Sequence, residues 1–389
     1  MSAIEIRTAR GWREVGEFIE LPFRLHAGTP WVPPLRIERR LFLSRRPRLG
    51  IYAKRMDFEL FCAFRGGELV GRISAHIDIA YNAHHGARWG WFGFFESIDD
   101  QQVADALLDA AEAWLRAKGM ERMVGPADFT VNDESGIVIE GAEEPPMVRE
   151  PWHPAYYRTL MEKAGMGKVV DLYMYDLPVT ERENLHPAVE QIGKAATAEH
   201  GVTIRLMSRR ELRKDLDVFQ KVYNHAWRKN WGFVPYSDED IDQYALELQL
   251  VFDRKWFMIA EKDGEPVAIA ITVPDINRAL QRMNGRVLPF GWIHYLRRRR
   301  YIDRVRVGFL GVLPGAQHTG VAAALYLEQF YTCARDPLVK AGETGWILET
   351  NRAMNNAMEA MNGRINKRYR MYERLLEDGA ERQQLGEPA

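Results

Sequence analysis

Two segments far apart in the chain carry the same pattern, and this repeat is the strongest constraint on the fold. LFCAFRGGELVGRIS (60–74) and FMIAEKDGEPVAIAI (257–271) each consist of an apolar run, a polar turn with glycine and a second apolar run. Each pattern predicts an antiparallel β-hairpin. The aligned identities are Ala63 with Ala260, Gly67 with Gly264, Glu68 with Glu265, and Val70 with Val267. A chain that repeats one supersecondary pattern is expected to fold as two copies of one unit.

The repeat extends beyond the hairpins. DLYMYDL (171–177) and RYRMYERL (368–375) each contain a Met-Tyr-acid triplet, and the triplets are spaced like the hairpins. Between hairpin and triplet, each half has one alanine-rich helical segment, at 99–119 and at 317–336. The second half is longer before its helix, so we expect an insertion there, at 276–300.

Each half is thus predicted to contain a strand, helices, a hairpin, a long strand, a helix, a further strand, a helix and closing strands. This order predicts two mixed α+β units in tandem. We expect strands at 4–8, 58–65, 69–79, 88–96 and 121–125, and at 202–207, 256–261, 266–273, 303–313 and 345–349. The predicted domains are 1–180 and 200–378, with a polar boundary at 178–187 and a polar tail at 379–389.

Composition narrows the possible partners. The 389 residues suit two domains, and the net charge of −1 gives no reason to expect a nucleic-acid partner. Cys62 and Cys333 lie far apart without metal-ligand spacing, so neither a disulfide framework nor a metal site is expected. No signal peptide and no membrane span stand out, which predicts a cytoplasmic protein without a membrane partner. The run Arg297–Arg300 is interpreted as a solvated face, although such a run could also bind phosphate or RNA.

The segment VLPGAQHTGVAAAL (312–325) places a loop of small and polar residues just before a helix that follows a β-branched strand. A helix N-terminus presents free N–H groups and the positive end of the helix dipole, which together bind phosphate. The spacing matches neither a dinucleotide-binding loop nor a nucleotide P-loop. The sequence therefore predicts a different phosphate-binding loop at this position.

This segment resembles the acyl-CoA loop of the GCN5-related N-acetyltransferase (GNAT) superfamily. The residues that carry the resemblance are Val312, Pro314, Gln317, Gly320, Ala322 and Leu325. A helix, the strand WILET and the segment NRAMNNAMEAMNGR follow in the order typical of the superfamily. By repetition, the first half resembles a second copy. The resemblance implies two acyl-CoA N-acyltransferase folds in tandem, each with a mixed, mostly antiparallel sheet flanked by helices.

The resemblance also implies a cofactor site in the second copy, for acetyl-CoA or another acyl-CoA. Main-chain groups of Leu310 and Val312 would hold pantetheine, and Asn351 and Asn355 would line the other side of the cofactor. The pyrophosphate would lie on the loop formed by Gln317, His318, Thr319, Gly320, Val321 and Ala322.

The first copy departs from this pattern. Aligning Leu108 with Leu325 puts Asp100 at the position of Gln317 and Val103 at that of Gly320. An aspartate there would cap the helix and repel a pyrophosphate. We therefore expect the first domain to lack the cofactor and to complete the substrate cleft.

Catalytic residues are harder to place. Acyl transfer to an amine needs a base and an acid. The superfamily's acid is often a tyrosine, but Glu359 stands at the corresponding position. Tyr372 is our candidate acid, with Tyr326 as the alternative. Glu349 is our candidate base, preferred over Asp303 because it directly precedes the predicted cofactor-lining segment; it could equally cap the following helix.

The sequence thus predicts an acyl-CoA-dependent N-acyltransferase, with acetyl-CoA as the expected donor and a small-molecule or peptide amine as acceptor. One alternative is a Fem-type aminoacyl or peptidyl transferase, which would use aminoacyl-tRNA and give the arginine run a role. The other is a non-catalytic acyl-CoA-binding sensor or scaffold.

Overall fold

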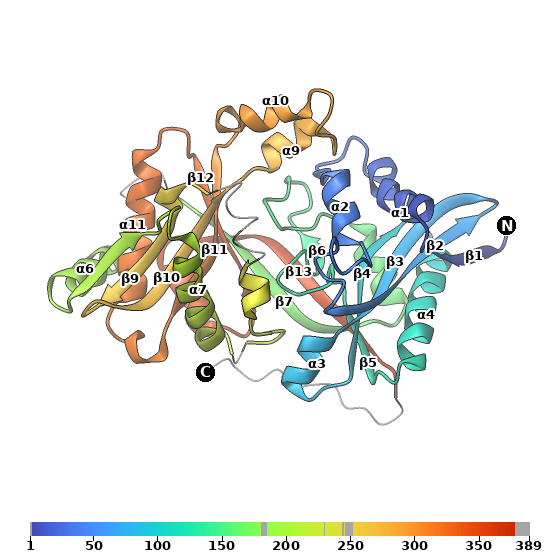
Figure 1. Cartoon of the computed structure of the whole chain (residues 1–389), viewed down its shortest axis with the longest axis horizontal. Helices are drawn as coiled ribbons and strands as arrows, with labels where there is room; N and C mark the ends of the chain where they lie inside the picture. Colours follow the sequence, from blue (N-terminus) through green and yellow to red (C-terminus); the bar gives the residue numbers. More distant parts are fainter. Residues whose placement is uncertain (1, 180–184, 229, 243–244, 246–251, 378–389) are drawn as a thin grey trace. The chain divides into compact units, whose positions relative to one another are not determined.

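The computed structural model describes residues 2–179, 185–228, 230–242, 245 and 252–377 (Figure 1). The expected tail at 379–389 and part of the expected boundary at 178–187 lie outside these residues. The described chain forms two compact units. Unit 1 contains the residues up to Leu172, the segment Ile276–Tyr301 and residues 367–377, and unit 2 contains the described parts of Tyr173–Asp275 and Ile302–Asn366.

Unit 1 is built on a mixed sheet. Its strands, in spatial order, are β1 (Ile4–Thr8), β2 (Met56–Arg65), β3 (Glu68–Asp78), β4 (Trp89–Ser97), β5 (Arg122–Gly125) and β13 (Arg364–Leu375). Neighbouring strands are antiparallel except for β4 and β5, which are parallel. A further strand, β6 (Ile137–Glu140), also pairs with β13.

Helices cover both faces of this sheet. Phe58, Leu60 and Cys62 of β2 pack with α1 (Trp12–Leu25) and α2 (Arg36–Phe42), whereas Phe61 and Ala63 pack with α4 (Gln101–Ala117). This alternation follows from the two-residue period of a strand, which sends successive side chains to opposite faces. The other helices of unit 1 are α3 (Ile79–His85), α5 (Tyr156–Lys163), α9 (Asn277–Met283) and α10 (Gly291–Leu296).

Unit 2 repeats this architecture. Its strands, in spatial order, are β8 (Val202–Leu206), β9 (Phe257–Lys262), β10 (Glu265–Pro274), β11 (Arg304–Val312), β12 (Ala341–Leu348) and β7 (Gly167–Leu177). The neighbours from β8 to β11 are antiparallel, and β11 and β12 are parallel. Ile259 and Ile269 pack with α7 (Leu212–Ala226), whereas Met258 and Ala268 pack with α6 (Pro187–Ala198) and α11 (Val321–Arg335). The last described helix is α12 (Arg352–Ala360).

The two units confirm the tandem mixed α+β fold that the repeat predicts, and they differ from the expected domain ranges in three segments. Residues 173–179, expected in the first domain, belong to unit 2. Residues 367–377 and Ile276–Tyr301 belong to unit 1, although both come late in the chain. The closing strands are accordingly exchanged: β13 completes the sheet of unit 1 and β7 that of unit 2. The strand β6 was not expected from the sequence. Among the described residues, no helix has the length and apolar content needed to cross a bilayer.

Candidate functional site

The parallel strands β11 and β12 of unit 2 separate along their length. Pairing runs from Arg304 with Ala341 to Val307 with Thr344 and then stops, although both strands continue. At the same level β11 has a bulge, because Phe309 pairs with Ile271 and Val307 with Thr272, which leaves the intervening residue unpaired. The carboxyl-terminal halves of the two strands therefore present unpaired edges to each other.

The main chain of β11 offers hydrogen-bonding groups along this gap. The N–H of Leu313 donates to the carbonyl of Val267 on the β10 side, at 2.9 Å. Because main-chain groups of a strand alternate in direction, those of Val312 and Leu310 point away from β10, toward the gap. The structure thus places the two predicted pantetheine-binding residues where an extended ligand could pair with them.

The helix α11 begins beyond the gap with open amides. Its N-cap is Gly320, in the left-handed conformation at φ 74°, and no side chain caps the helix. Within the described chain, the N–H groups of five residues meet no acceptor: His318, Gly320, Val321, Ala322 and Ala323. The N–H of Thr319 donates to Ala316, and that of Gln317 lies 3.5 Å from the Pro314 carbonyl. Gln317 and His318 are exposed, Gly320, Ala322 and Ala323 are partly buried, and Val321 is fully buried, so this N-terminus meets solvent on its loop side.

The N-terminus of the corresponding helix of unit 1, α4, is capped by a side chain. Leu108 of α4 and Leu325 of α11 are both fully buried, as equivalent positions should be. Gln101, the first residue of α4, lies seven residues before Leu108, whereas Val321 lies four residues before Leu325. Helix therefore replaces the loop in unit 1, and the Asp100 carboxylate caps it by accepting from two main-chain N–H groups.

The gap of unit 1 is filled as well. The strands β4 and β5 pair only from Trp89 to Trp91, after which the N–H of Ala127 donates to the carbonyl of Phe92 at 2.8 Å. The N–H of Phe94 donates to the Asp128 carboxylate at 2.8 Å. The main-chain groups that an extended ligand would use are thus bonded within unit 1. That the first copy lacks the cofactor stays a prediction.

The predicted residues after β12 have mainly local partners. The side chain of Asn351 caps α12 by accepting from the Met354 N–H at 3.1 Å. Asn355 donates to the carbonyls of Leu348 and Glu349 and accepts from the Tyr175 hydroxyl. Glu349 itself lies just past the end of β12, half-buried, within unit 2. Asn351 and Asn355 therefore hold the start of α12 in place, beside the end of the gap.

The two candidate tyrosines lie in different units. Tyr372 lies in β13 within the core of unit 1, where burial raises the pKa of its hydroxyl to about 12. Tyr326 lies in α11 of unit 2, and its hydroxyl is 3.8 Å from the Met354 sulfur. Burial raises the pKa of Tyr326 as well. Of the two, only Tyr326 belongs to the unit that carries the open helix, together with Glu349.

Unit 2 also contains an apolar cavity. Its volume is about 50 Å³, room for a few methylene groups and well below the roughly 300–1,000 Å³ of whole small-molecule sites. Its lining includes Val305 and Val307 of β11, Tyr326 and Phe330 of α11, and Gly342 of β12. The cavity therefore borders the paired half of β11 and β12, at the level where the two strands begin to separate.

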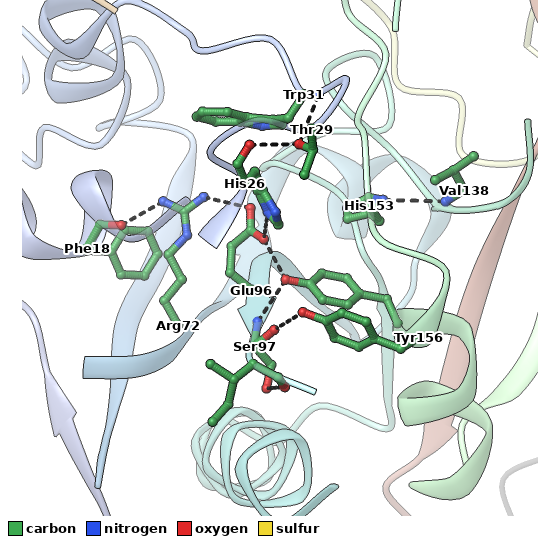
Figure 2. Close-up of polar contacts among 12 residues, drawn as sticks. Phe18, His26, Thr29, Trp31, Arg72, Glu96, Ser97, Val138, His153 and Tyr156 are labelled. Carbon is green, nitrogen blue, oxygen red and sulfur yellow. Dashed lines mark hydrogen bonds and ion pairs between the residues drawn. The ribbon is translucent and has the colours of Figure 1, made fainter. Parts of the chain in front are cut away.

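Unit 1 has a buried polar cluster that the sequence analysis missed (Figure 2). Its centre is Glu96 at the end of β4, which accepts from His26 Nε2 at 2.6 Å and from the Tyr157 hydroxyl at 2.7 Å. Arg72 lies 3.4 Å from the other carboxylate oxygen and donates to the Phe18 carbonyl. Burial raises the pKa of Glu96, but His26 and Arg72 outweigh it and hold that pKa at about 2. A carboxylate with so low a pKa is a weak base, so we interpret the cluster as an anchor that joins β3, β4, α1 and α5.

The same cluster holds a neutral histidine. His153 is buried beside Tyr157, and its Nδ1 accepts from the Val138 N–H at 3.4 Å. Burial lowers the pKa of His153 to about 4. A sequence signal for the cluster exists in hindsight, because Arg72 and Glu96 each follow a run of apolar or small residues within a strand.

His153 and His76 predict how the stability depends on pH. Burial lowers the pKa of His76 to about 3, so both histidines are neutral when folded and gain a proton only on unfolding. The stability that the two neutral histidines contribute should therefore be fully present above pH 6.5, the ordinary histidine pKa. The free energy of unfolding should fall as the pH drops toward 4, by about 1.4 kcal/mol per pH unit for each histidine. Urea unfolding at several pH values in this range gives the free energy of unfolding as a function of pH. Its slope against pH should be shallower for His153→Gln than for wild type, and unchanged for the exposed control His200→Gln. Equal slopes for all three proteins would contradict the buried, neutral state of His153.

Comparisons with known proteins agree with this architecture. No family model matches the chain. It is 33% identical over 381 residues to Protein YghO of Escherichia coli (strain K12), covering 95% of each chain. It is also 33% identical over 384 residues to the bacterial ceramide synthase of Caulobacter vibrioides, covering 97% of this chain and 98% of the relative.

Solved structures show the same fold at low sequence identity. A tandem GNAT protein from the clavulanic acid biosynthesis pathway matches with a TM-score of 0.55 at 11% identity, over 97% of this chain and all of the other. The GCN5-related glucosamine N-acetyltransferase region of a fungal β-N-acetylglucosaminidase matches with a TM-score of 0.58, over 96% of this chain and 38% of the other. The chain thus belongs to the same family as Protein YghO and the bacterial ceramide synthase, and it has the fold of a tandem GNAT protein.

Proposed function

We propose that the chain is an acyl-CoA-dependent N-acyltransferase that joins a long-chain acyl group to the amino group of a long-chain amine. The observation that carries the proposal is the pairing of open amides before α11 with the gap between β11 and β12. A CoA thioester has a diphosphate that the open amides could bind and an extended pantetheine arm that could lie in the gap. The capped helix and filled gap of unit 1 favour a single CoA site, in unit 2.

Two observations favour a long acyl chain over the acetyl group expected from the loop pattern. The cavity beside Val307 and Tyr326 is apolar and lies next to the point where the gap begins. In addition, one relative is named a ceramide synthase, and a ceramide is the amide of a fatty acid with a long-chain amino alcohol. Acetyl transfer remains the competing donor assignment.

The reaction itself is an acyl exchange. The amine nitrogen attacks the thioester carbonyl carbon, the C–N bond forms as the C–S bond breaks, the nitrogen loses a proton to a base, and the sulfur leaves as a thiol after gaining one. Glu349 stays our candidate base, and Tyr326 or Tyr372 our candidate acid. The bulge of β11 places the main chain around Gly308 at the separation point, where an N–H could stabilise the developing oxyanion.

A chain-length assay tests the proposal. Purified protein is given acetyl-CoA or palmitoyl-CoA with sphinganine as acceptor, and both thiol release and the amide product are measured. We expect palmitoyl transfer to dominate. Val307→Phe, which fills the cavity, should lower the palmitoyl-to-acetyl rate ratio at least about tenfold, since a lost pocket for a few methylenes costs more than 1.4 kcal/mol.

The control is Val273→Phe, a partly buried valine of β10 that does not line the cavity. Because the rate ratio is taken within each variant, a loss of folded protein cancels. Preferred use of acetyl-CoA, or an equal ratio in both variants, would contradict the long-chain assignment. CoA binding without turnover on any amine would favour the sensor alternative.

A further inference from the structure

We propose that the α9–α10 segment, Ile276–Tyr301, is a docking surface for an anionic lipid bilayer. This inference does not depend on the proposed acyltransfer, because it concerns a different part of the chain and a different partner. The absence of an evident membrane span in the sequence predicts no membrane partner, but a segment that lies on a bilayer needs no span.

Apolar side chains are concentrated on the outer part of this segment. Among the described residues, the large exposed apolar side chains include five between 287 and 296: Val287, Leu288, Phe290, Trp292 and Leu296. Leu288 is 73% exposed, Phe290 70% and Leu296 65%. Trp292 and Leu296 stand four residues apart on α10, so they share one face of the helix. Such clustering of aromatic and aliphatic groups in contact with water marks an interaction site.

The charge of the segment has one sign. Residues 276–302 contain seven arginines and no acidic residue, in a chain whose net charge is −1. Arg286, Arg297, Arg299 and Arg300 are exposed, and none forms an ion pair with another described residue. These arginines lie on both sides of the apolar stretch 287–296. An apolar centre with arginines at its ends matches an anionic membrane surface, with the apolar groups inserted and the cations at the headgroups.

The first part of the segment, α9 and the turn after it, is anchored in unit 1. Ala279 and Met283 of α9 are buried, and the Asn277 side chain donates to the Pro146 carbonyl at 3.0 Å. Arg36 of α2 donates to the carbonyls of Asn284 and Gly285, at 2.8 and 3.1 Å. The apolar side chains after this turn are thus presented by a fixed base in unit 1, with α9 and α10 adjacent (Figure 1).

Two other occupants fit less well. Single-stranded RNA could use the arginines and stack bases on Phe290 and Trp292, but it gives no reason for the exposed aliphatic chains of Leu288 and Leu296. A second copy of the chain, docked symmetrically, would bring one arginine-rich segment against the other without an acidic residue to pair with. A bilayer with anionic lipid uses both kinds of side chain.

Vesicle co-sedimentation of the full chain tests the proposal, with phosphatidylcholine vesicles that either contain or lack phosphatidylglycerol. We expect binding to the anionic vesicles only, and weaker binding as salt is raised. A variant with Leu288→Ser, Phe290→Ser and Leu296→Ser, and another with Arg297→Gln, Arg299→Gln and Arg300→Gln, should each bind at least about tenfold more weakly. The matched control carries Leu49→Ser and Leu338→Ser, which remove exposed leucines elsewhere, and should bind like wild type.

A second readout locates the contact. Brominated lipids quench tryptophans that enter the acyl region, so wild type should be quenched more than Trp292→Phe. Circular dichroism checks that each variant is folded. Failure of the wild-type chain to bind anionic vesicles would overturn the proposal, as would undiminished binding by both triple variants. Binding of polyuridylate in the absence of vesicle binding would instead identify a nucleic-acid surface. None of these results bears on acyl transfer, which the chain-length assay measures without vesicles.

Discussion

Gly320→Asp is expected to abolish CoA binding while leaving the chain folded. The new carboxylate would stand at the N-cap of α11, beside the amides proposed to bind the diphosphate. Two charges about 4 Å apart near a protein surface interact by about 4 kcal/mol, so the affinity should fall at least about a hundredfold. Isothermal titration with CoA gives the affinity directly.

The control for this variant is Gly320→Asn, because Gly320 has a left-handed backbone and a β-carbon there would lie 2.8 Å from the Ile192 side chain. Asparagine has the size of aspartate and tolerates the left-handed region, so it carries the same steric cost without the charge. Gln102→Glu, an exposed change in the first turn of α4, should not affect binding. Equal loss in the aspartate and asparagine variants would show that shape rather than charge decides, and loss in Gln102→Glu would contradict a single site in unit 2.

Lys367→Met is expected to lower the free energy of unfolding more than the histidine variants and the exposed-lysine variant do. Lys367 and Glu150 form an ion pair at 3.2 Å in unit 1, with side chains 1% and 2% exposed. Removing the cation leaves a buried carboxylate whose charge is poorly compensated, which costs about 3–5 kcal/mol. Urea unfolding measures the difference from wild type.

A second variant shows whether the pair is the cause. Adding Glu150→Gln to Lys367→Met removes the stranded charge and should restore part of the stability. Lys194→Met breaks an exposed pair with Glu190 and should cost about 0.5 kcal/mol or less. If the buried and the exposed lysine variants lost the same stability, the buried pair would have no special role.

The local pattern of the chain predicted much of the fold. The aligned hairpins correspond to β2–β3 and β9–β10, and the expected strand at 88–96 corresponds to β4. Each of these strands alternates apolar residues or carries a long apolar run, so its own residues determine it. The four-residue strand β6 has only the short apolar run at 137–139, and its pairing with β13 is a contact that sequence patterns cannot show.

Long-range placement was beyond the sequence. The closing segments DLYMYDL and RYRMYERL resemble each other, so either could complete either sheet, and the structure gives β13 to unit 1 and β7 to unit 2. The segment 276–300 was predicted as an insertion of the second half, but contacts of Arg36 and Pro146 hold it in unit 1. Those contacts join residues far apart in the chain, and no local pattern indicates them.

Some features of the candidate site could likewise be predicted from the sequence, and others could not. The loop before α11 could be predicted because glycine and small residues before a helix have a direct consequence for the amides. The polar contacts of Asn351 and Asn355 could not, since a cap and a bond to a strand carbonyl depend on the exact turn after β12. Tyr372 and Glu349 were chosen by their place in the pattern, and their catalytic roles remain predictions.

A crystal structure of the full chain with CoA tests the central claim most directly. We predict that the diphosphate lies within hydrogen-bonding distance of the amides of His318 and Gly320–Ala322, that the pantetheine arm lies along Leu310–Val312, and that nothing binds at Asp100. A diphosphate bound in unit 1, or bound in unit 2 away from the amides before α11, would contradict it.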